Sequence, residues 1–161
     1  MTKPRWLSPE EQSAWRNWIA VSRLLPEQLS KDLEEEHGLS LVEYEILAIL
    51  SEAPDQKLRM HELARATWAS RSKLTHQVNR LESLGFVNRE TCKIDARGQF
   101  AVLTKKGVAK VTKAAPDHVE SVRAHLVDQL GTRFVGFGNL NATIVKHLTK
   151  IAPDDSCGTK S

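Results

Sequence analysis

Cysteine is scarce in this chain of 161 residues, and the two copies, Cys92 and Cys157, form neither a disulfide framework nor a metal-ligand spacing. Long apolar runs are also lacking, since none approaches the ~18 residues that a membrane span needs. The opening residues have no apolar stretch of the kind found in secretion signals. We therefore expect a cytoplasmic protein with reduced thiols and no membrane contact.

Patterns typical of catalysis are missing as well. No Ser/His/Asp or Cys/His set has a persuasive spacing, and Gly136-x-Gly138 lacks the strand and third glycine of a dinucleotide loop. His118 and His125 could share a helix face and bind a metal, but no histidine pair has a recognisable zinc spacing. The histidines that could join them are His37, His61 and His147. We expect scattered surface histidines, no cofactor and no enzyme.

The charge of the chain is distributed unevenly. Residues 1–55 carry 5 Lys+Arg against 11 Asp+Glu, a net −6. Residues 56–104 carry 9 against 4, a net +5, and residues 105–161 carry 9 against 5, a net +4. The composition, 40% hydrophobic and 27% charged, is ordinary for one compact domain or one subunit of a small oligomer. The positive charge begins where a pair of short helices is expected.

That helix pair is the centre of the chain. We expect one helix over 60–67, a turn at 68–70, and a second helix from Ser70 to Leu84 that Gly85 ends. In the second helix Leu74, Val78 and Leu81 recur at helical spacing, whereas most other positions are small, polar or basic. A helix held by one apolar stripe, with its other faces free to donate hydrogen bonds, suits a DNA major groove.

Residues near the start of such a helix usually reach the bases. The predicted DNA-contacting residues of this helix are Ser70, Arg71, Ser72, Lys73, Thr75, His76, Gln77 and Arg80. The alternative is a solvated helix face, which is what most charge runs are, since helix-turn-helix patterns also occur by chance.

A hairpin follows, with strands over 86–92 and 99–103. Arg97 follows Asp95 near its tip, where an arginine can enter a narrow minor groove. Arg89 and Lys93 would lie along phosphates. Alternatively, Asp95 and Arg97 form a salt bridge in the turn, and Asp95 could do both by orienting Arg97. Cys92 could be oxidised near the DNA, but a structural role is the simpler interpretation.

The segments on either side are expected to be helical. Ser8 and Glu11 form a capping box, Pro26 predicts a kink or a restart, and Gly38 ends the first helix. Its tryptophans predict half of a subunit interface, with packing inside one chain as the alternative.

Ser40 and Glu43 cap a short buried helix. Thr104 begins a long helix that Pro116 should kink or break. The glycines between residues 131 and 139 predict a poor helix there, before a helical pattern returns over 141–151.

These pieces, in this order, resemble MarR-type winged helix-turn-helix transcriptional regulators. The resemblance rests on the series from Ser70 to Val87, on Asp95-x-Arg97, and on Leu103-Thr104-x-x-Gly107. It implies a mainly α (α+β) fold. Residues 1–39 would form an N-terminal dimerisation helix, 40–104 the winged-helix DNA-binding lobe, 105–152 C-terminal dimerisation helices and 153–161 a disordered tail.

The resemblance also implies a homodimer that binds double-stranded DNA at a pseudo-palindrome, as a repressor released by a small phenolic or lipophilic anion. For that ligand we suggest the neighbourhood of Trp15, Trp18, Tyr44 and Met60, although these side chains could equally be interface core. The competing hypothesis is a winged-helix protein-interaction module without sequence-specific DNA contact.

Overall fold

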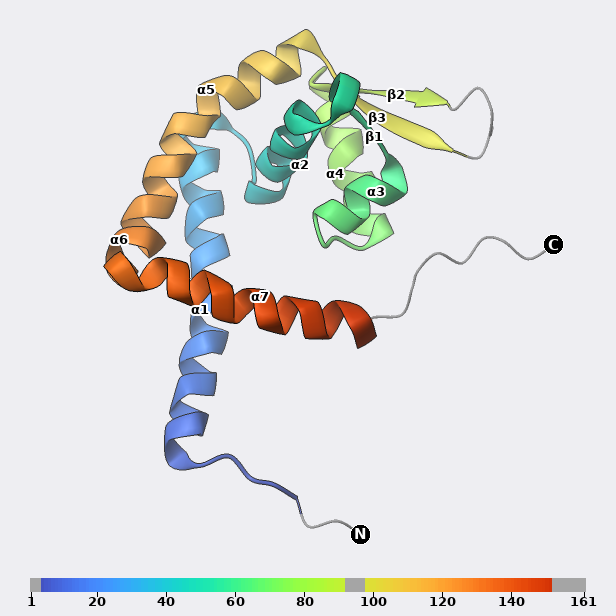
Figure 1. Cartoon of the computed structure of the whole chain (residues 1–161). Helices are drawn as coiled ribbons and strands as arrows, with labels where there is room; N and C mark the ends of the chain where they lie inside the picture. Colours follow the sequence, from blue (N-terminus) through green and yellow to red (C-terminus); the bar gives the residue numbers. More distant parts are fainter. Residues whose placement is uncertain (1–3, 92–97, 152–161) are drawn as a thin grey trace, which may run out of the picture. The chain divides into compact units, whose positions relative to one another are not determined.

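The structure is a computed structural model that describes residues 4–91 and 98–151 (Figure 1). Its contacts divide the chain into one compact unit that ends at Val122 and another that begins at Arg123, and each unit is described by itself. In the first unit the elements are α1 (Pro9–His37), α2 (Leu41–Glu52), the short 3-10 helix η1 (Pro54–Gln56), β1 (Lys57–Arg59), α3 (Met60–Ala66), α4 (Arg71–Ser83), β2 (Val87–Thr91), β3 (Gln99–Leu103) and α5 (Lys105–Val122).

The predicted ends of α1 are confirmed. The Ser8 hydroxyl accepts the Glu11 N–H at 3.2 Å, and the Glu11 carboxylate accepts the Ser8 N–H at 2.8 Å. Gly38 ends the helix in the left-handed conformation with φ +62°. Pro26 lies inside α1, so the helix does not restart there. Proline removes one hydrogen bond, and the buried Leu29 and Leu33 hold the following turns in place.

A small sheet forms the edge of the same unit. Its strands are antiparallel in the order β1-β3-β2, with Leu58 opposite Ala101 and Val87 opposite Leu103. Val87 and Ala101 are fully buried, so one face of the sheet covers the core. Both strands of the predicted hairpin are confirmed, and Leu58 and Arg59, which the sequence suggests as a very short strand, lie in β1.

The core lies between α2, α3, α4 and this sheet, and Leu33 of α1 and Val111 and Ala114 of α5 complete it. Its fully buried members include Leu47 of α2, Leu63 of α3 and the α4 residues Val78 and Leu81. The fold is mostly helical with a three-stranded antiparallel sheet, which is the winged-helix arrangement that the sequence predicts.

The junction between α4, the sheet and α5 is unusually tight. The Thr104 hydroxyl donates to the Gly85 carbonyl at 2.8 Å and accepts the Gly107 N–H at 3.0 Å. A Cβ atom on Gly107 would lie 2.2 Å from the Phe86 carbonyl oxygen. No side chain fits there, so glycine is required for the close approach rather than for its backbone angles.

The sequence predicts either a kink or a break of the helix at Pro116, and the break is wrong. Pro116 lies inside α5, which continues to Val122. The helix is held by the buried Val111 and Ala114 and by contacts with α1, which outweigh one missing hydrogen bond.

The second unit is helical throughout its described part. A π-helical segment η2 (Arg123–Val127), the short α6 (Asp128–Leu130) and the 3-10 turn η3 (Gly131–Arg133) precede α7 (Phe134–Ile151). The poor helix predicted between residues 131 and 139 is found only at its start, because α7 includes Gly136 and Gly138. Two glycines cost about 1 kcal/mol each in a helix, and propensity is easily overridden. Only Gly131, with φ +54°, is non-helical.

Candidate nucleic-acid interface

Helix α4 begins with a polar side-chain cap and packs against the core through one face. The Ser70 hydroxyl accepts the Lys73 N–H at 3.4 Å. Leu74, Val78 and Leu81 are buried, which confirms the predicted stripe. Because the stripe occupies one side only, the rest of the helix surface remains in solvent.

The structure brings most of the predicted contact residues together at the first two turns of α4. The exposed ones are Ser70, Arg71, Ser72, Lys73, Thr75 and His76, and Gln77 is half-buried. They provide two cations, several hydroxyls, an amide and an imidazole, the groups that contact phosphates and base edges. Their contact with DNA remains a prediction.

Arg80 is different from these residues. Its Nη1 atom donates to both carboxylate oxygens of Glu43, at 2.6 and 2.7 Å, and the Glu43 side chain is completely buried. Glu43 also accepts the Ser40 N–H as the capping box of α2, which confirms that predicted cap. The ion pair joins α4 to α2, so the Arg80 guanidinium holds these two helices together.

Arg89 of β2 is also held inside the chain. Its Nη2 atom donates to the Asn79 side-chain oxygen and, at 3.3 Å, to the Thr75 carbonyl. Its Nε atom lies 3.7 Å from the Glu82 carboxylate. These contacts connect the first strand of the hairpin to α4. The predicted wing residues Lys93, Asp95 and Arg97, together with Cys92, lie outside the described residues.

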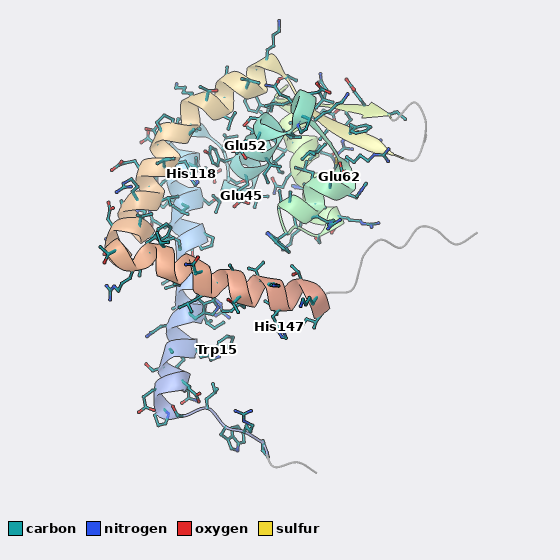
Figure 2. The ribbon with its side chains drawn as sticks, viewed as in Figure 1. Trp15, Glu45, Glu52, Glu62, His118 and His147 are labelled. Atoms are coloured by element: carbon teal, nitrogen blue, oxygen red, sulfur yellow. The ribbon has the colours of Figure 1, made fainter. Side chains whose placement is uncertain are left out.

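The residues suggested for a ligand are not brought together within one chain. Tyr44 is buried, with its ring centroid 4.3 Å from that of His118. Trp15 and Trp18 lie in the exposed first half of α1, as Figure 2 shows for Trp15. Leu33, further along α1, lines a hollow beside His118. Trp15 lies about 27 Å of helix rise before Leu33, too far to share that hollow. Met60 is half-buried at the start of α3.

The hollow beside His118 lies between α1 and α5. It is lined by Asp32, Leu33, Glu36, His37, Asp117, His118 and Ser121. His37 Nε2 lies 2.8 Å from the Asp117 carboxylate, and Ser121 donates to Asp32. With three carboxylates in its lining, this hollow is a poor site for an anion. No group of three or more histidine, cysteine or acidic residues in the described ranges could hold a metal ion.

Burial changes several pKa values around α2. It lowers the pKa of His118, because the positive form loses solvation. It raises the pKa of Tyr44, with a smaller contribution from the Glu52 carboxylate, and it raises the pKa of Glu45. Figure 2 labels these acidic residues on α2 and His118 on α5. No helix among the described residues is long and apolar enough to cross a membrane.

Comparison with known proteins identifies the relatives of this chain. Residues 39–98 match the MarR family. AbsC, a MarR family transcriptional regulator from Streptomyces coelicolor, is 44% identical in sequence to this chain. Its crystal structure matches with a TM-score of 0.85, and the match covers 91% of this chain and 99% of AbsC. Sco3205, a MarR family regulator from the same organism solved in complex with DNA, is 40% identical with a TM-score of 0.85, covering 89% and 94%.

A curated relative is more distant. The transcriptional regulator MhqR of Bacillus subtilis (strain 168) is 26% identical over 100 residues, which cover 62% of this chain and 67% of MhqR. The strong match to AbsC extends over nearly all of both chains, beyond the winged-helix lobe itself. From this likeness and from the fold described above, the chain belongs to the MarR family of transcriptional regulators.

Proposed function

We propose that this protein is a homodimeric repressor that reads a pseudo-palindromic operator with its two α4 helices and is released by a small-molecule ligand. The observation that carries the proposal is the exposed polar face of α4, whose opposite face is buried through the stripe of Leu74, Val78 and Leu81. Two such helices in a symmetric dimer would enter successive major grooves, ~34 Å apart.

The roles of the α4 residues follow from their chemistry. Arg71 and Lys73 would neutralise phosphates or reach guanine, and the Ser70 and Ser72 hydroxyls would donate to phosphate oxygens. His76 and Gln77, one turn further along, would contact base edges, and Thr75 would meet a thymine methyl or a phosphate. Arg80 and Arg89 have a different role in this proposal, since their guanidinium groups hold α4 against α2 and β2.

The proposed dimer is supported by the apolar side chains that one chain leaves exposed. Trp15, Leu24 and Val21 are exposed on α1, and Leu140 and Leu148 are exposed on α7. Apolar side chains in such number on two helices are typical of a surface covered by a partner. The N- and C-terminal helices thus remain our proposed dimerisation regions, and residues 40–104 our proposed DNA-binding lobe.

The proposed ligand is a flat phenolic or lipophilic compound, bound where the α1 tryptophans of a dimer would lie. The exposed rings of Trp15 and Trp18 support that location, and the carboxylates around His118 argue against the hollow between α1 and α5. Ligand binding would favour a spacing of the two α4 helices that no longer matches the half-sites.

The test is binding to DNA fragments tiled across the region upstream of the protein's own gene, measured by fluorescence anisotropy during a salt titration. We expect a specific fragment whose affinity falls steeply with salt. Lys73→Ala should weaken binding to all fragments and reduce the salt slope by about 1 per half-site. Lys31→Ala, which removes an exposed lysine from α1, is the matched control and should have no effect.

His76→Ala addresses base reading separately. A binding-site selection with this variant should recover a changed consensus, whereas an unchanged consensus would assign His76 to the solvated face. If the wild-type protein distinguishes no fragment from random DNA at moderate salt, the proposed function is wrong and the protein-interaction hypothesis takes its place.

A further inference from the structure

Trp68, in the turn between α3 and α4, has an unexpected backbone conformation. Its φ is +52°, a left-handed value that bulky side chains rarely adopt. The Trp68 N–H donates to the Arg65 carbonyl at 3.3 Å, and the Ala69 N–H donates to the Ala64 carbonyl at 3.2 Å. This pair of hydrogen bonds is the Schellman ending of a helix, in which glycine usually occupies the left-handed position. Here that position holds the largest side chain available.

The packing of the protein does not explain this choice. The Trp68 side chain is 73% exposed, whereas the next residue, Ala69, packs against the hydrophobic core. The turn therefore needs only a left-handed residue followed by a small apolar one, and glycine at position 68 would form it without strain. Strained backbone combined with an exposed aromatic is typical of functional positions.

The place of Trp68 in the fold indicates what it contacts. It lies two residues before Ser70, the cap of α4, and close in sequence to the cations Arg71 and Lys73. In helix-turn-helix proteins the second helix enters the major groove while the first crosses the sugar-phosphate backbone, so the turn between them lies near the groove edge. An indole there can cover a deoxyribose ring and donate its Nε1–H to a phosphate oxygen.

We propose that Trp68 is a DNA-anchoring residue that packs its indole against the sugar-phosphate backbone at the edge of the major groove. The inference rests on the proposed DNA-binding function and adds a contact to it that carries affinity but no sequence information. The left-handed conformation of residue 68 is then the structural cost of placing an aromatic side chain outward at this point.

The test compares Trp68→Gly with the wild-type protein in two measurements. Glycine removes the indole and relieves the backbone, so the melting temperature should stay the same or rise by about 2 °C. The affinity for the operator fragment should nevertheless fall roughly tenfold. The opposite directions of the two changes exclude a folding defect as the cause of weaker binding.

Two further variants complete the design. Gln56→Gly relieves another left-handed residue of the same unit, with φ +55°, and should leave the DNA affinity unchanged. Trp68→Phe keeps a ring but loses the indole N–H, and should retain most of the affinity. Binding-site selection with Trp68→Gly should return the wild-type consensus, because the proposed contact is to the backbone.

The outcomes separate this inference from the function on which it rests. If the wild-type protein binds its operator and Trp68→Gly binds equally well, the anchoring role is wrong while the proposed function stands. A changed consensus would also overturn it, since it would assign Trp68 to the bases. A shift of Trp68→Gly from dimer to monomer in sedimentation would overturn it by placing the indole in a subunit interface.

Discussion

The winged-helix lobe and the terminal helices of this chain bury their apolar side chains to very different extents. In the lobe, Leu47, Leu63 and Val78 are completely shielded from solvent. In α7 none of the described residues is buried, and Val135 is 72% exposed. The lobe is thus built around buried apolar side chains, whereas the apolar side chains of α7 are exposed.

Helix α1 contains both situations. Its last third buries Leu29 and Leu33, whereas Trp15 and Leu24 in its first two thirds are exposed. Since a helix of 29 residues rises about 43 Å, its two ends can belong to different environments. The contrast predicts that changes in the lobe act within one chain, and that changes in the exposed apolar faces act through a second copy.

The largest expected effect is that of Arg80→Ala. It leaves the buried Glu43 carboxylate without its cation, which should cost about 3 kcal/mol of unfolding free energy. Urea unfolding at two protein concentrations should give the same loss, because the ion pair lies within one chain. The double variant Glu43→Gln with Arg80→Ala removes the buried charge and should recover part of the lost unfolding free energy. A loss that depends on protein concentration would contradict the comparison.

Ile144→Asp should have the next largest effect. Ile144 of α7 is half exposed in the single chain, and burying it against a second copy would contribute about 2 kcal/mol per chain. Sedimentation equilibrium should show the variant shifted from dimer toward monomer. Lys146→Asp, on the opposite side of the same helix, introduces the same side chain and should remain dimeric. An Ile144→Asp protein that is as dimeric as wild type would argue against a partner for this face.

Arg89→Ala tests the edge of the lobe and should have a smaller effect. The Arg89 side chain is 22% exposed, and its bonds to Asn79 and Thr75 tie the hairpin to α4. Because the site is partly solvated, we expect a loss of about 1 kcal/mol in urea unfolding. Arg89→Lys, which keeps the charge but not the guanidinium group, should lose a similar amount of unfolding free energy. A loss as large as that of Arg80→Ala would contradict this ranking and would mean that the Arg89 contacts matter as much as the buried ion pair.

The smallest expected effect concerns pH. Burial lowers the pKa of His118 in the folded protein relative to its usual value of 6.5, so the unfolded chain takes up a proton more readily. This contribution to stability is present above pH 6.5 and is lost as the pH falls toward the folded-state value. His118→Phe keeps a ring against Tyr44 and should show a shallower loss of melting temperature over that range. Identical pH profiles would show that His118 does not contribute.

Local patterns predicted much of this fold. The capping boxes at Ser8 and Ser40, the left-handed Gly85 and the stripe of α4 are interactions between residues close in sequence, and all are confirmed. The two strands of the hairpin could be predicted because alternation and turn residues also act locally.

What the sequence could not show depends on contacts between distant segments. Arg80 faces away from the α4 stripe and therefore suggested a DNA contact, but it meets a buried carboxylate 37 positions earlier in the chain. Glu43 showed only its cap pattern, and nothing local indicated that its second partner lies on another helix. The continuity of α5 through Pro116 could not be predicted, because propensity omits the packing of Val111 and Ala114.

Trp68 was missed for a related reason. Its side chain carries no charge, so a search for basic and amide groups passes over it, and a left-handed backbone cannot be recognised when glycine is not the residue used. A tryptophan at the expected end of a short helix was the one signal available.

The glycine at position 107 has a mechanical consequence. No Cβ fits between Gly107 and the Phe86 carbonyl, and the Thr104 hydroxyl is hydrogen-bonded to both Gly85 and Gly107. The start of α5 therefore has no room to slide or tilt against the end of α4. A rotation of α5 would therefore move the end of α4 with it. Gly107→Ala would force the start of α5 away from the Phe86 carbonyl, and α5 and α4 would then be less tightly coupled.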